Sequence, residues 1–136
     1  MSGDLPPVQP GFELPPLRSE PITLRQLRDY ACASGDFNRL HLSPDFAREA
    51  GHPSPPAHGM LTMALMGRLL TGWAGAGSVR KLDVRFLDVT YVGERVLCEG
   101  RVTACNDETA TLEVWATRSD GKKTAAGTAE LVLPKR

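Results

Sequence analysis

The longest apolar stretch of the sequence, Met60 to Trp73, constrains the fold more than any other feature of the chain. It predicts a helix from about His58 to Gly72 with apolar side chains on almost every face, because Arg68 is its only residue of the Lys, Arg, Asp and Glu types. A helix without a polar face belongs inside a protein, covered by other elements. The stretch is also too short to cross a bilayer, so we expect a buried helix and no membrane span.

Two shorter helices are expected before this apolar helix. A capping-box spacing that begins at Thr23 predicts the first of them, and Gly35 is its stop signal. Ser43 as the N-cap and Pro44 at the first helical position predict a second, short helix that Gly51 ends. The apolar residues expected on its buried side are Phe46, Ala47 and Ala50.

After Val79 the hydrophobic period changes to two, which predicts strands. The expected strands cover about 79–86, 96–104, 111–116 and 124–132, with short turns at 93–94, 106–107 and 120–121. Strands joined by short turns form an antiparallel meander, and the lead from Phe12 to Leu17 is a candidate edge strand. We therefore expect an α+β protein with the hot-dog fold, in which an antiparallel sheet is wrapped around a long central apolar helix.

The size and the charge of the chain exclude some classes of protein. With 136 residues, of which 41% are apolar, the sequence fits one domain, residues 1–136, with one core. Lysine plus arginine and aspartate plus glutamate are balanced at 16 each, so the formal net charge is zero. Because nucleic-acid binding rests on neutralising phosphates, we expect no nucleic-acid partner.

The cysteines and the N-terminal segment favour a cytoplasmic protein. Cys32, Cys98 and Cys105 are odd in number and lack paired C-x-x-C spacing, which favours free thiols in a reducing compartment over a disulfide framework. The segment from Met1 to Gly11 is rich in proline and has no apolar core, so we do not expect a signal peptide. Together these features predict a soluble protein of the cytoplasm.

The stretch from Tyr30 to Ala47 carries the chemistry that the sequence predicts, and it reads YACASGDFNRLHLSPDFA. The polar residues that it places in a loop between two expected helices are Asp36, Asn38 and His41. A second stretch, PPAHGM, places His58 and Gly59 at the start of the apolar helix. Each of these residues alone is common in turns or loops, but their joint spacing is rare, which favours a catalytic role.

These two motifs resemble those of the MaoC-like, (R)-specific enoyl-CoA hydratase family. The family motif is an aromatic residue, then G-D-x-N-P-[LIV]-H, then an alanine, and the matching residues are Tyr30, Gly35, Asp36, Asn38, Leu40, His41 and Ala47. The A-H-G-M segment and the order of the elements are also similar, over most of the chain. The chain resembles the β-subunit-type hydroxyacyl thioester dehydratases of mycolate-producing bacteria as well. Arg39 stands where the family has a proline that would stiffen the loop.

The resemblance implies a hydro-lyase of fatty acid metabolism, which converts a 2-enoyl thioester into an (R)-3-hydroxyacyl thioester or catalyses the reverse dehydration. Hydration of a conjugated double bond needs a base for the water, an acid for C2 and a donor for the thioester oxygen. The resemblance implies that Asp36 and His41 are the catalytic pair, without deciding which of them protonates C2. Gly59 suits an oxyanion hole at the helix N-terminus, and Asn38 and His58 are expected to position the loop and the substrate.

Two other functions stay open from the sequence. A hot-dog thioesterase would release a free acid and a thiol, and a non-catalytic acyl-thioester-binding subunit would need neither Asp36 nor His41. A zinc site formed by His41, His52 and His58 lacks the compact spacing of zinc motifs. Because the sequence also has no phosphate-binding glycine loop, we expect the protein to need no metal and no cofactor.

The expected partners are an acyl thioester and a second subunit. The acyl carrier is coenzyme A or acyl carrier protein, and the basic residues available to bind it are Arg80, Lys81, Arg85, Lys122 and Lys123. The central helix is too apolar to be covered easily by one small sheet, and the resemblance implies paired subunits with acyl tunnels between them. We therefore expect a dimer, with an identical partner or a different one.

Overall fold

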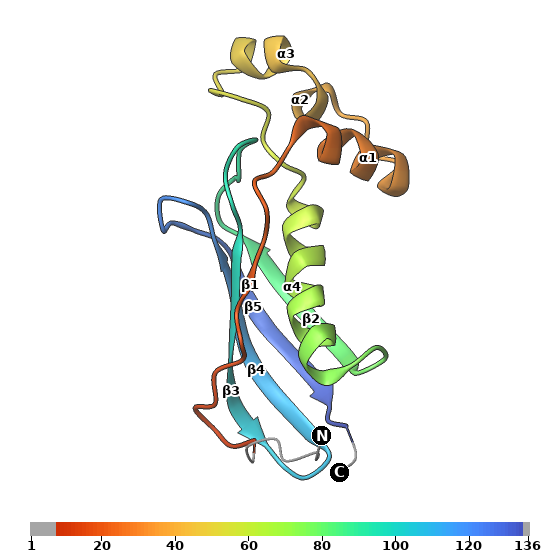
Figure 1. Ribbon diagram of the computed structural model, residues 1–136, viewed down its shortest axis with the longest axis vertical. Coiled ribbons are helices and arrows are strands. Elements are labelled where there is room, and N and C mark those ends of the chain that lie inside the picture. The colour runs from red at the N-terminus through yellow and green to blue at the C-terminus, as the bar shows by residue number, and fades with distance from the viewer. Residues whose placement is uncertain (1–7, 135–136) are drawn as a thin grey trace.

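The computed structural model describes residues 8–134, so most of the proline-rich lead from Met1 lies outside the described residues. One five-stranded antiparallel sheet carries a long helix across one face, and three shorter helices lie beyond one end of it (Figure 1). The elements in chain order are β1 (Leu17–Arg18), α1 (Leu24–Ser34), α2 (Arg39–Leu42), α3 (Pro44–Glu49), α4 (Gly59–Ala74), β2 (Val79–Phe86), β3 (Leu97–Cys105), β4 (Thr109–Thr117) and β5 (Lys123–Val132). This arrangement confirms the predicted hot-dog fold.

The caps of α1 and α3 follow the sequence signals closely. The Thr23 hydroxyl accepts a hydrogen bond from the N–H of Gln26, and Gly35 ends α1 with a left-handed φ of 80°. Ser43 caps α3 in the same way, and Pro44 is its first residue. The prediction for the buried side of α3 was wrong for one residue: Ala47 is buried, but Ala50 lies after the last helical turn and is exposed.

The strands are ordered β1-β3-β4-β5-β2 in the sheet. The predicted meander is therefore correct for β3, β4 and β5 and wrong for β2, which pairs with β5 and not with β3. Residues 87–96 cross from the edge strand β2 to β3, which lies next to the other edge, so the turn signal at 93–94 lies inside a crossover. The N-terminal lead does form the other edge, because β1 pairs with β3 and Glu13 forms a bridge with Arg101.

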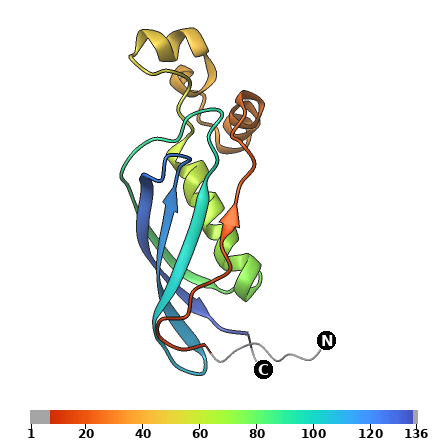
Figure 2. The ribbon, with the colours of Figure 1, turned by 60° about the vertical axis from the view of Figure 1, so that its left-hand side comes forward.

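One side of α4 packs against the sheet, and the other side is open in a single chain (Figure 2). The buried residues of the helix are Leu61, Thr62, Leu65, Met66, Leu69, Leu70 and Ala74. They meet inward-facing strand residues such as Val102, Leu112 and Leu131 in one core. On the open side Met60 is 54% exposed, and Ala64, Arg68 and Thr71 are exposed too. Within residues 8–134, no helix is long and apolar enough to span a membrane.

A charged network holds the crossover against the β4–β5 turn. The guanidinium of Arg118 donates to the carbonyl of Val89 at 2.8 Å and lies 3.4 Å from the Asp88 carboxylate. Lys122 contacts the other oxygen of Asp88 at 2.7 Å. Because Arg118 is only 14% exposed, its contacts with the crossover are largely shielded from solvent.

We expect this network to weaken in acid. The hydrogen bond from Lys122 and the one from the Val89 N–H lower the pKa of Asp88 from 3.8 to about 2. A carboxyl group whose pKa is lower in the folded than in the unfolded protein stabilises the fold when it is ionised in both states. The contribution of Asp88 is therefore complete above about pH 4 and is lost as the pH falls toward 2. Asp88→Asn should therefore lower the urea midpoint at neutral pH, and the difference from wild type should vanish near pH 2. Asp107→Asn, in the exposed β3–β4 turn, is the control. A difference that stays constant with pH would contradict this role of Asp88.

Candidate active site

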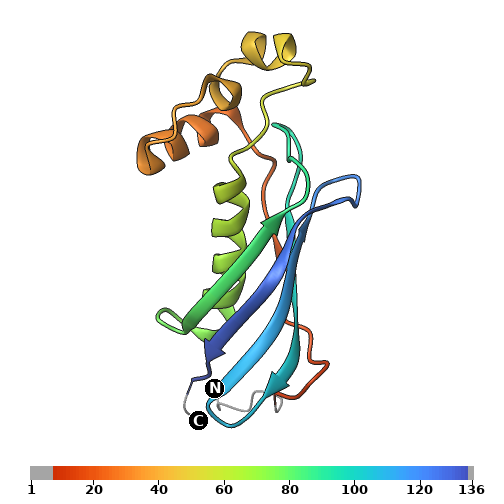
Figure 3. The same cartoon turned by 180° about the vertical axis from the view of Figure 1, so that it is seen from behind.

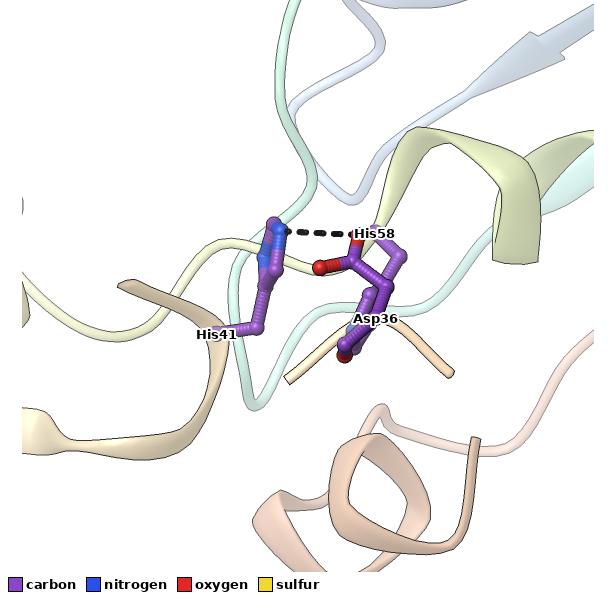
Figure 4. A group of neighbouring side chains, drawn as sticks. All are labelled: Asp36, His41 and His58. Atoms are coloured by element: carbon purple, nitrogen blue, oxygen red, sulfur yellow. Dashed lines mark hydrogen bonds and ion pairs between the residues drawn. The ribbon is translucent and has the colours of Figure 1, made fainter. Parts of the chain in front are cut away.

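Three polar residues from two segments of the sequence meet at the junction of the short helices with α4. Asp36 lies between α1 and α2, His41 lies on α2, and His58 is the N-cap of α4. One nitrogen or carboxylate oxygen from each lies within 4.8 Å of the others (Figure 4). His41 Nε2 is 3.9 Å from Asp36 Oδ2. The structure thus brings the expected acid–base pair together and adds His58 to it.

The tautomer of the neutral His41 ring is set by its backbone partner. Its Nδ1 lies 2.7 Å from the carbonyl oxygen of Pro56, which can only accept a hydrogen bond. Nδ1 must therefore carry the proton, and Nε2 of the neutral ring keeps its lone pair on the side of Asp36. The His41 side chain is 15% exposed, so this basic nitrogen is partly shielded and still accessible to a small molecule.

The side chains of Asp36 and Asn38 each accept a hydrogen bond from a backbone N–H two residues later. One oxygen of the Asp36 carboxylate, Oδ1, accepts a hydrogen bond from the Asn38 N–H at 3.2 Å, which leaves Oδ2 facing His41. The Asn38 side chain caps α2 by accepting from the N–H of Leu40 at 3.0 Å. Asn38 therefore links the loop of Asp36 to the helix that carries His41.

His58 is buried beneath the pair. Its side chain is enclosed, with the residue only 2% exposed, and its Nε2 lies 3.1 Å from the carbonyl oxygen of Asp36. Its ring stacks on His41 with centroids 3.9 Å apart, and the Tyr30 ring lies 5.0 Å away on a tilted plane. Since Nε2 donates to a carbonyl, Nδ1 bears a lone pair, and it has no hydrogen-bond partner in the structure. His58 thus fixes the backbone of Asp36 and the ring of His41 at once.

Gly59 opens α4 beside this cluster. The N-cap, His58, makes no side-chain hydrogen bond to the helix, and its carbonyl accepts from the Leu61 N–H at 3.0 Å. Within residues 8–134 the N–H groups of Gly59 and Met60 have no acceptor, so they can bind one from a ligand. The macrodipole of a 16-residue helix adds positive potential at the same place. A Cβ at position 59 would lie 3.3 Å from the Phe86 ring, so glycine permits a close approach at this helix terminus. These features suit the stabilisation of a developing oxyanion.

The gap between His41 and Asp36 is chemically useful. A distance of 3.9 Å is too long for a direct hydrogen bond, and a small molecule with two donors can bond to both groups at once. Water has this property, and His41 Nε2 and Asp36 Oδ2 are both acceptors when His41 is neutral. The site can therefore hold a water molecule between a base and a carboxylate, next to the free N–H groups of a helix.

The cluster is a poor metal site despite its composition. Asp36, His41 and His58 are the residue types that bind zinc, whereas His52, considered from the sequence, is not part of the group. A metal ion lies in the plane of each imidazole that binds it, at about 2 Å from the nitrogen. The ring centroids of His41 and His58 are 3.9 Å apart, and the two stacked rings are tilted by only 26°, so their planes meet well beyond about 2 Å from either ring. One ion cannot bind both rings without their rearrangement.

Several residues of the site gave no usable signal in the sequence. Pro56 acts through its carbonyl oxygen, a group that every residue has. The crossover supports this segment, because Thr90 accepts from the N–H of Ala57 at 2.7 Å and Pro55 accepts from Val92 at 3.1 Å. Tyr30, which packs beside His58, differs from these residues because the sequence motif already included it as its aromatic residue.

The other candidate groups lie away from the chemistry. His52 is half-buried, and its Nδ1 lies 2.9 Å from the Tyr91 hydroxyl, outside the cluster. The cysteines are free thiols, as predicted. Burial raises the pKa of Cys98 to about 12, which makes it a poor nucleophile. Cys32 is exposed on α1.

Arg39 replaces the proline of the motif at the first residue of α2. This position tolerates proline, since its N–H has no acceptor within the helix. The Arg39 guanidinium instead lies 4.8 Å from the centre of the Phe46 ring and ties α2 to α3. This contact therefore replaces part of the rigidity that the family's proline would give to the loop.

We expect Arg39→Pro to leave the fold and the activity nearly unchanged. The preceding residue, Asn38, has φ −55° and ψ 125°, which a following proline allows. The entropy gained and the lost cation–π contact are each about 0.5–1 kcal/mol and oppose one another. Leu40→Pro is the contrasting variant, because it removes the N–H that bonds the Asn38 side chain. Thermal unfolding measures the stability of both variants, and turnover measures their activity. If Arg39→Pro lost as much stability and activity as Leu40→Pro, position 39 would not be one that tolerates proline.

The fold and the site together define a class of protein: a hot-dog domain with a histidine–carboxylate pair at the N-terminus of its central helix. The comparison with protein families agrees, because residues 8–123 match the model described as MaoC like domain. The chain belongs to this family.

Relatives and solved structures support the same assignment. The chain is 35% identical to the (R)-specific enoyl-CoA hydratase of Aeromonas caviae over 109 residues, which are 77% of this chain and 81% of that protein. The structure of an (R)-hydratase from A. caviae involved in PHA biosynthesis superposes with a TM-score of 0.85 and 30% identity, covering 98% of this chain and all of that one. The ChsH1–ChsH2 complex of Mycobacterium tuberculosis gives a TM-score of 0.83 at 26% identity, covering 93% and 98%.

Other relatives are far longer than this chain. It matches the fatty acid synthase beta subunit of Emericella nidulans at 32% identity over 78% of its own length, but spans only 6% of that protein. It matches the fatty acid synthase subunit beta of Gibberella zeae at 35% identity over 68% of its own length, and spans only 5% of that protein. The same kind of domain therefore occurs inside large multifunctional proteins.

Proposed function

We propose that this protein catalyses the reversible addition of water to a 2-enoyl thioester, which gives an (R)-3-hydroxyacyl thioester. The observation that carries the proposal is the facing pair of His41 Nε2 and Asp36 Oδ2, 3.9 Å apart, beside the free N-terminus of α4. Membership in the family and the hydratase names of its relatives support the same reaction.

In the proposed reaction, His41 and Asp36 hold one water molecule between them. One of the two takes a proton as the water oxygen bonds to C3, and a proton is delivered to C2, so that H and OH add across the double bond. The Gly59 N–H stabilises the negative charge that develops on the thioester oxygen. Asn38 and His58 act as positioning residues, because both bind the backbone or side chain of Asp36.

The product identifies the reaction class. Wild-type protein with trans-2-butenoyl-CoA should lose the absorbance of the conjugated thioester without releasing a thiol, and chiral analysis should find the (R)-3-hydroxy product. Release of free coenzyme A with the acyl chain unchanged would replace the proposal with a thioesterase. Tight binding of the substrate without turnover would indicate the non-catalytic subunit.

We expect activity without any metal or cofactor. The stacked geometry of His41 and His58 does not suit one ion, and the proposed proton transfers need none. Turnover should survive treatment with a chelator followed by dialysis, measured against an untreated sample. Loss of activity that zinc restores would overturn the metal-free mechanism.

We also propose that the protein acts as a dimer, with the open side of α4 at the interface. The exposed helix residues Met60, Ala64, Arg68 and Thr71 follow each other at the spacing of one helix face. Met60 and Ala64 make one end of this face apolar, and Phe86, 46% exposed at the end of the edge strand β2, continues the apolar part next to Gly59. Such a surface is typical of an interface in a soluble protein.

The oligomeric state can be measured directly. Size-exclusion chromatography with light scattering should give twice the chain mass at micromolar concentration, and Met60→Glu should shift the protein to monomer. Ala33→Glu, at an exposed position of α1, is the control. A stable wild-type monomer would refute the homodimer, and activity that appears only with a second, different chain would indicate a heterodimer.

The remaining proposals concern the organisation and location of the chain. We propose that residues 1–136 act as a single domain, supported by the one core that the described elements share. We propose a cytoplasmic location, supported by the free thiols of Cys32, Cys98 and Cys105.

A further inference from the structure

The outer face of the sheet, away from α4, contains a depression of about 580 Å³ that the proposed chemistry does not use. Figure 3 shows the sheet from this side, with β2, β5 and β4 next to one another in front of the helix. The small side chain of Ala126 on β5 lies between Arg85 on β2 and Trp115 on β4, which are its partners in the two registers. The two flanking strands are about 10 Å apart, so a planar group fits between the guanidinium and the indole.

Charges are separated along this depression. The next row of the sheet places Asp83, Thr128 and Glu113 side by side, so carboxylates lie at one end. Arg85 and Lys123 lie at the end marked by Leu87. Glu113 is already paired with Arg101 at 2.8 Å, whereas neither Arg85 nor Lys123 has an ion-pair partner within residues 8–134. The Leu87 end is therefore free to bind an anion.

Trp115 adds a stacking surface to this end. Its indole N–H donates to Glu99 at 3.3 Å, which holds the ring in place. The Lys123 ammonium lies 5.4 Å from the ring centre, so a cation and an aromatic face are presented together. A planar base stacks on an aromatic side chain, and Arg and Lys bind phosphate. The combination suits a ligand with a planar base and phosphate groups.

The anion-binding end lies behind the proposed active site. Phe86 faces α4 and its ring touches position 59, whereas its neighbours Arg85 and Leu87 line the depression on the opposite face. The end of β2 thus separates the proposed oxyanion site from the cationic end of the depression by about the thickness of one sheet. A flexible arm that passes the end of β2 at Leu87 can join the two places.

We propose that this depression binds the adenosine phosphate end of a coenzyme A thioester, with the base against Trp115 and the phosphates on Arg85 and Lys123. This inference rests on the proposed function and selects coenzyme A as the acyl carrier. Acyl carrier protein offers a phosphate on its arm but no adenine base for Trp115.

The test compares two substrates with the same acyl group: trans-2-butenoyl-CoA, and trans-2-butenoyl-N-acetylcysteamine, which has no nucleotide. Arg85→Gln and Trp115→Leu should each raise KM for the coenzyme A substrate about tenfold, as expected for one charge-assisted or stacking contact, with kcat unchanged. KM for the short substrate should not change. Arg28→Gln, which removes an exposed arginine of α1 that does not line the depression, is the matched control. Circular dichroism checks the fold of each variant.

Each result has a definite meaning. A KM unchanged in both variants, or raised equally for both substrates, overturns the nucleotide site. Adenosine 3′,5′-bisphosphate should compete with the coenzyme A substrate, and equal competition by 4′-phosphopantetheine would show that the base is not recognised, which also overturns it. If the wild type hydrates neither substrate, the proposed function fails. In that case calorimetric titration of the bisphosphate into wild type and Arg85→Gln tests the nucleotide site without turnover, and equal affinity for the two proteins overturns it.

Discussion

Asp36→Asn and His41→Ala should each reduce the hydration of trans-2-butenoyl-CoA by about 10²–10⁴-fold, because proton transfer by a positioned side chain contributes this much. Asp36→Asn keeps the shape of the side chain and its contact with the Asn38 N–H, and removes the negative charge that faces His41. His41→Ala removes the nitrogen that the Pro56 carbonyl orients. Loss of the conjugated thioester absorbance measures the rate.

The two losses should not multiply. Both groups are proposed to act on one water molecule, so removing either disables the same step. The double variant should therefore lose much less than the product of the two single losses. Full multiplicativity would show that the residues act in independent steps.

The controls for this experiment come from neighbouring residues of the same types. Asp45→Asn changes an exposed carboxylate of α3 that pairs with Arg48, and His52→Gln changes the histidine that bonds Tyr91. Both should retain near-normal turnover, and circular dichroism should show an intact fold for all variants. Near-normal rates in both Asp36→Asn and His41→Ala would remove the catalytic assignment and leave a hot-dog domain that binds acyl thioesters.

Gly127→Ala should destabilise the protein by about 3 kcal/mol or more, since this substitution forces two strands apart. A Cβ at position 127 on β5 would lie 1.8 Å from the backbone oxygen of Asp83 on β2. A backbone group cannot move aside as a flexible side chain does, so the β2–β5 pairing must shift. Urea unfolding, followed by circular dichroism, measures the loss.

Gly100→Ala is the matched control for this prediction. Gly100 also lies in a central strand, but a Cβ there would meet its nearest neighbour, the Val114 side chain, at 3.4 Å. This is an ordinary contact, so the change in stability should stay within about 1 kcal/mol, with the reduced entropy of the unfolded chain in its favour. Similar stability of Gly127→Ala and wild type would show that the close approach of β2 and β5 is not required.

Local patterns in the sequence predicted most of the helices and strands and the candidate reactive residues. Helix caps depend on side chains within a few residues of each other, which is why Thr23, Gly35 and Ser43 mark their helices correctly. The loop motif likewise depends on spacing, so Asp36, Asn38 and His41 were visible as a group. The one-turn helix α2 was missed, because a single turn has too few residues for a hydrophobic period.

Tertiary structure alone decided the partners of these elements. No turn signal tells that β2 pairs with β5 across the sheet, since that pairing depends on which apolar faces meet in the core. The tautomer of His41 depends on the Pro56 carbonyl, and the position of Asp36 depends on His58 from another helix. The slot between Arg85 and Trp115 exists only because Ala126 lies between them in the register. Such contacts join residues far apart in the chain, so they follow from the packing of the folded protein and leave no periodic trace in its sequence.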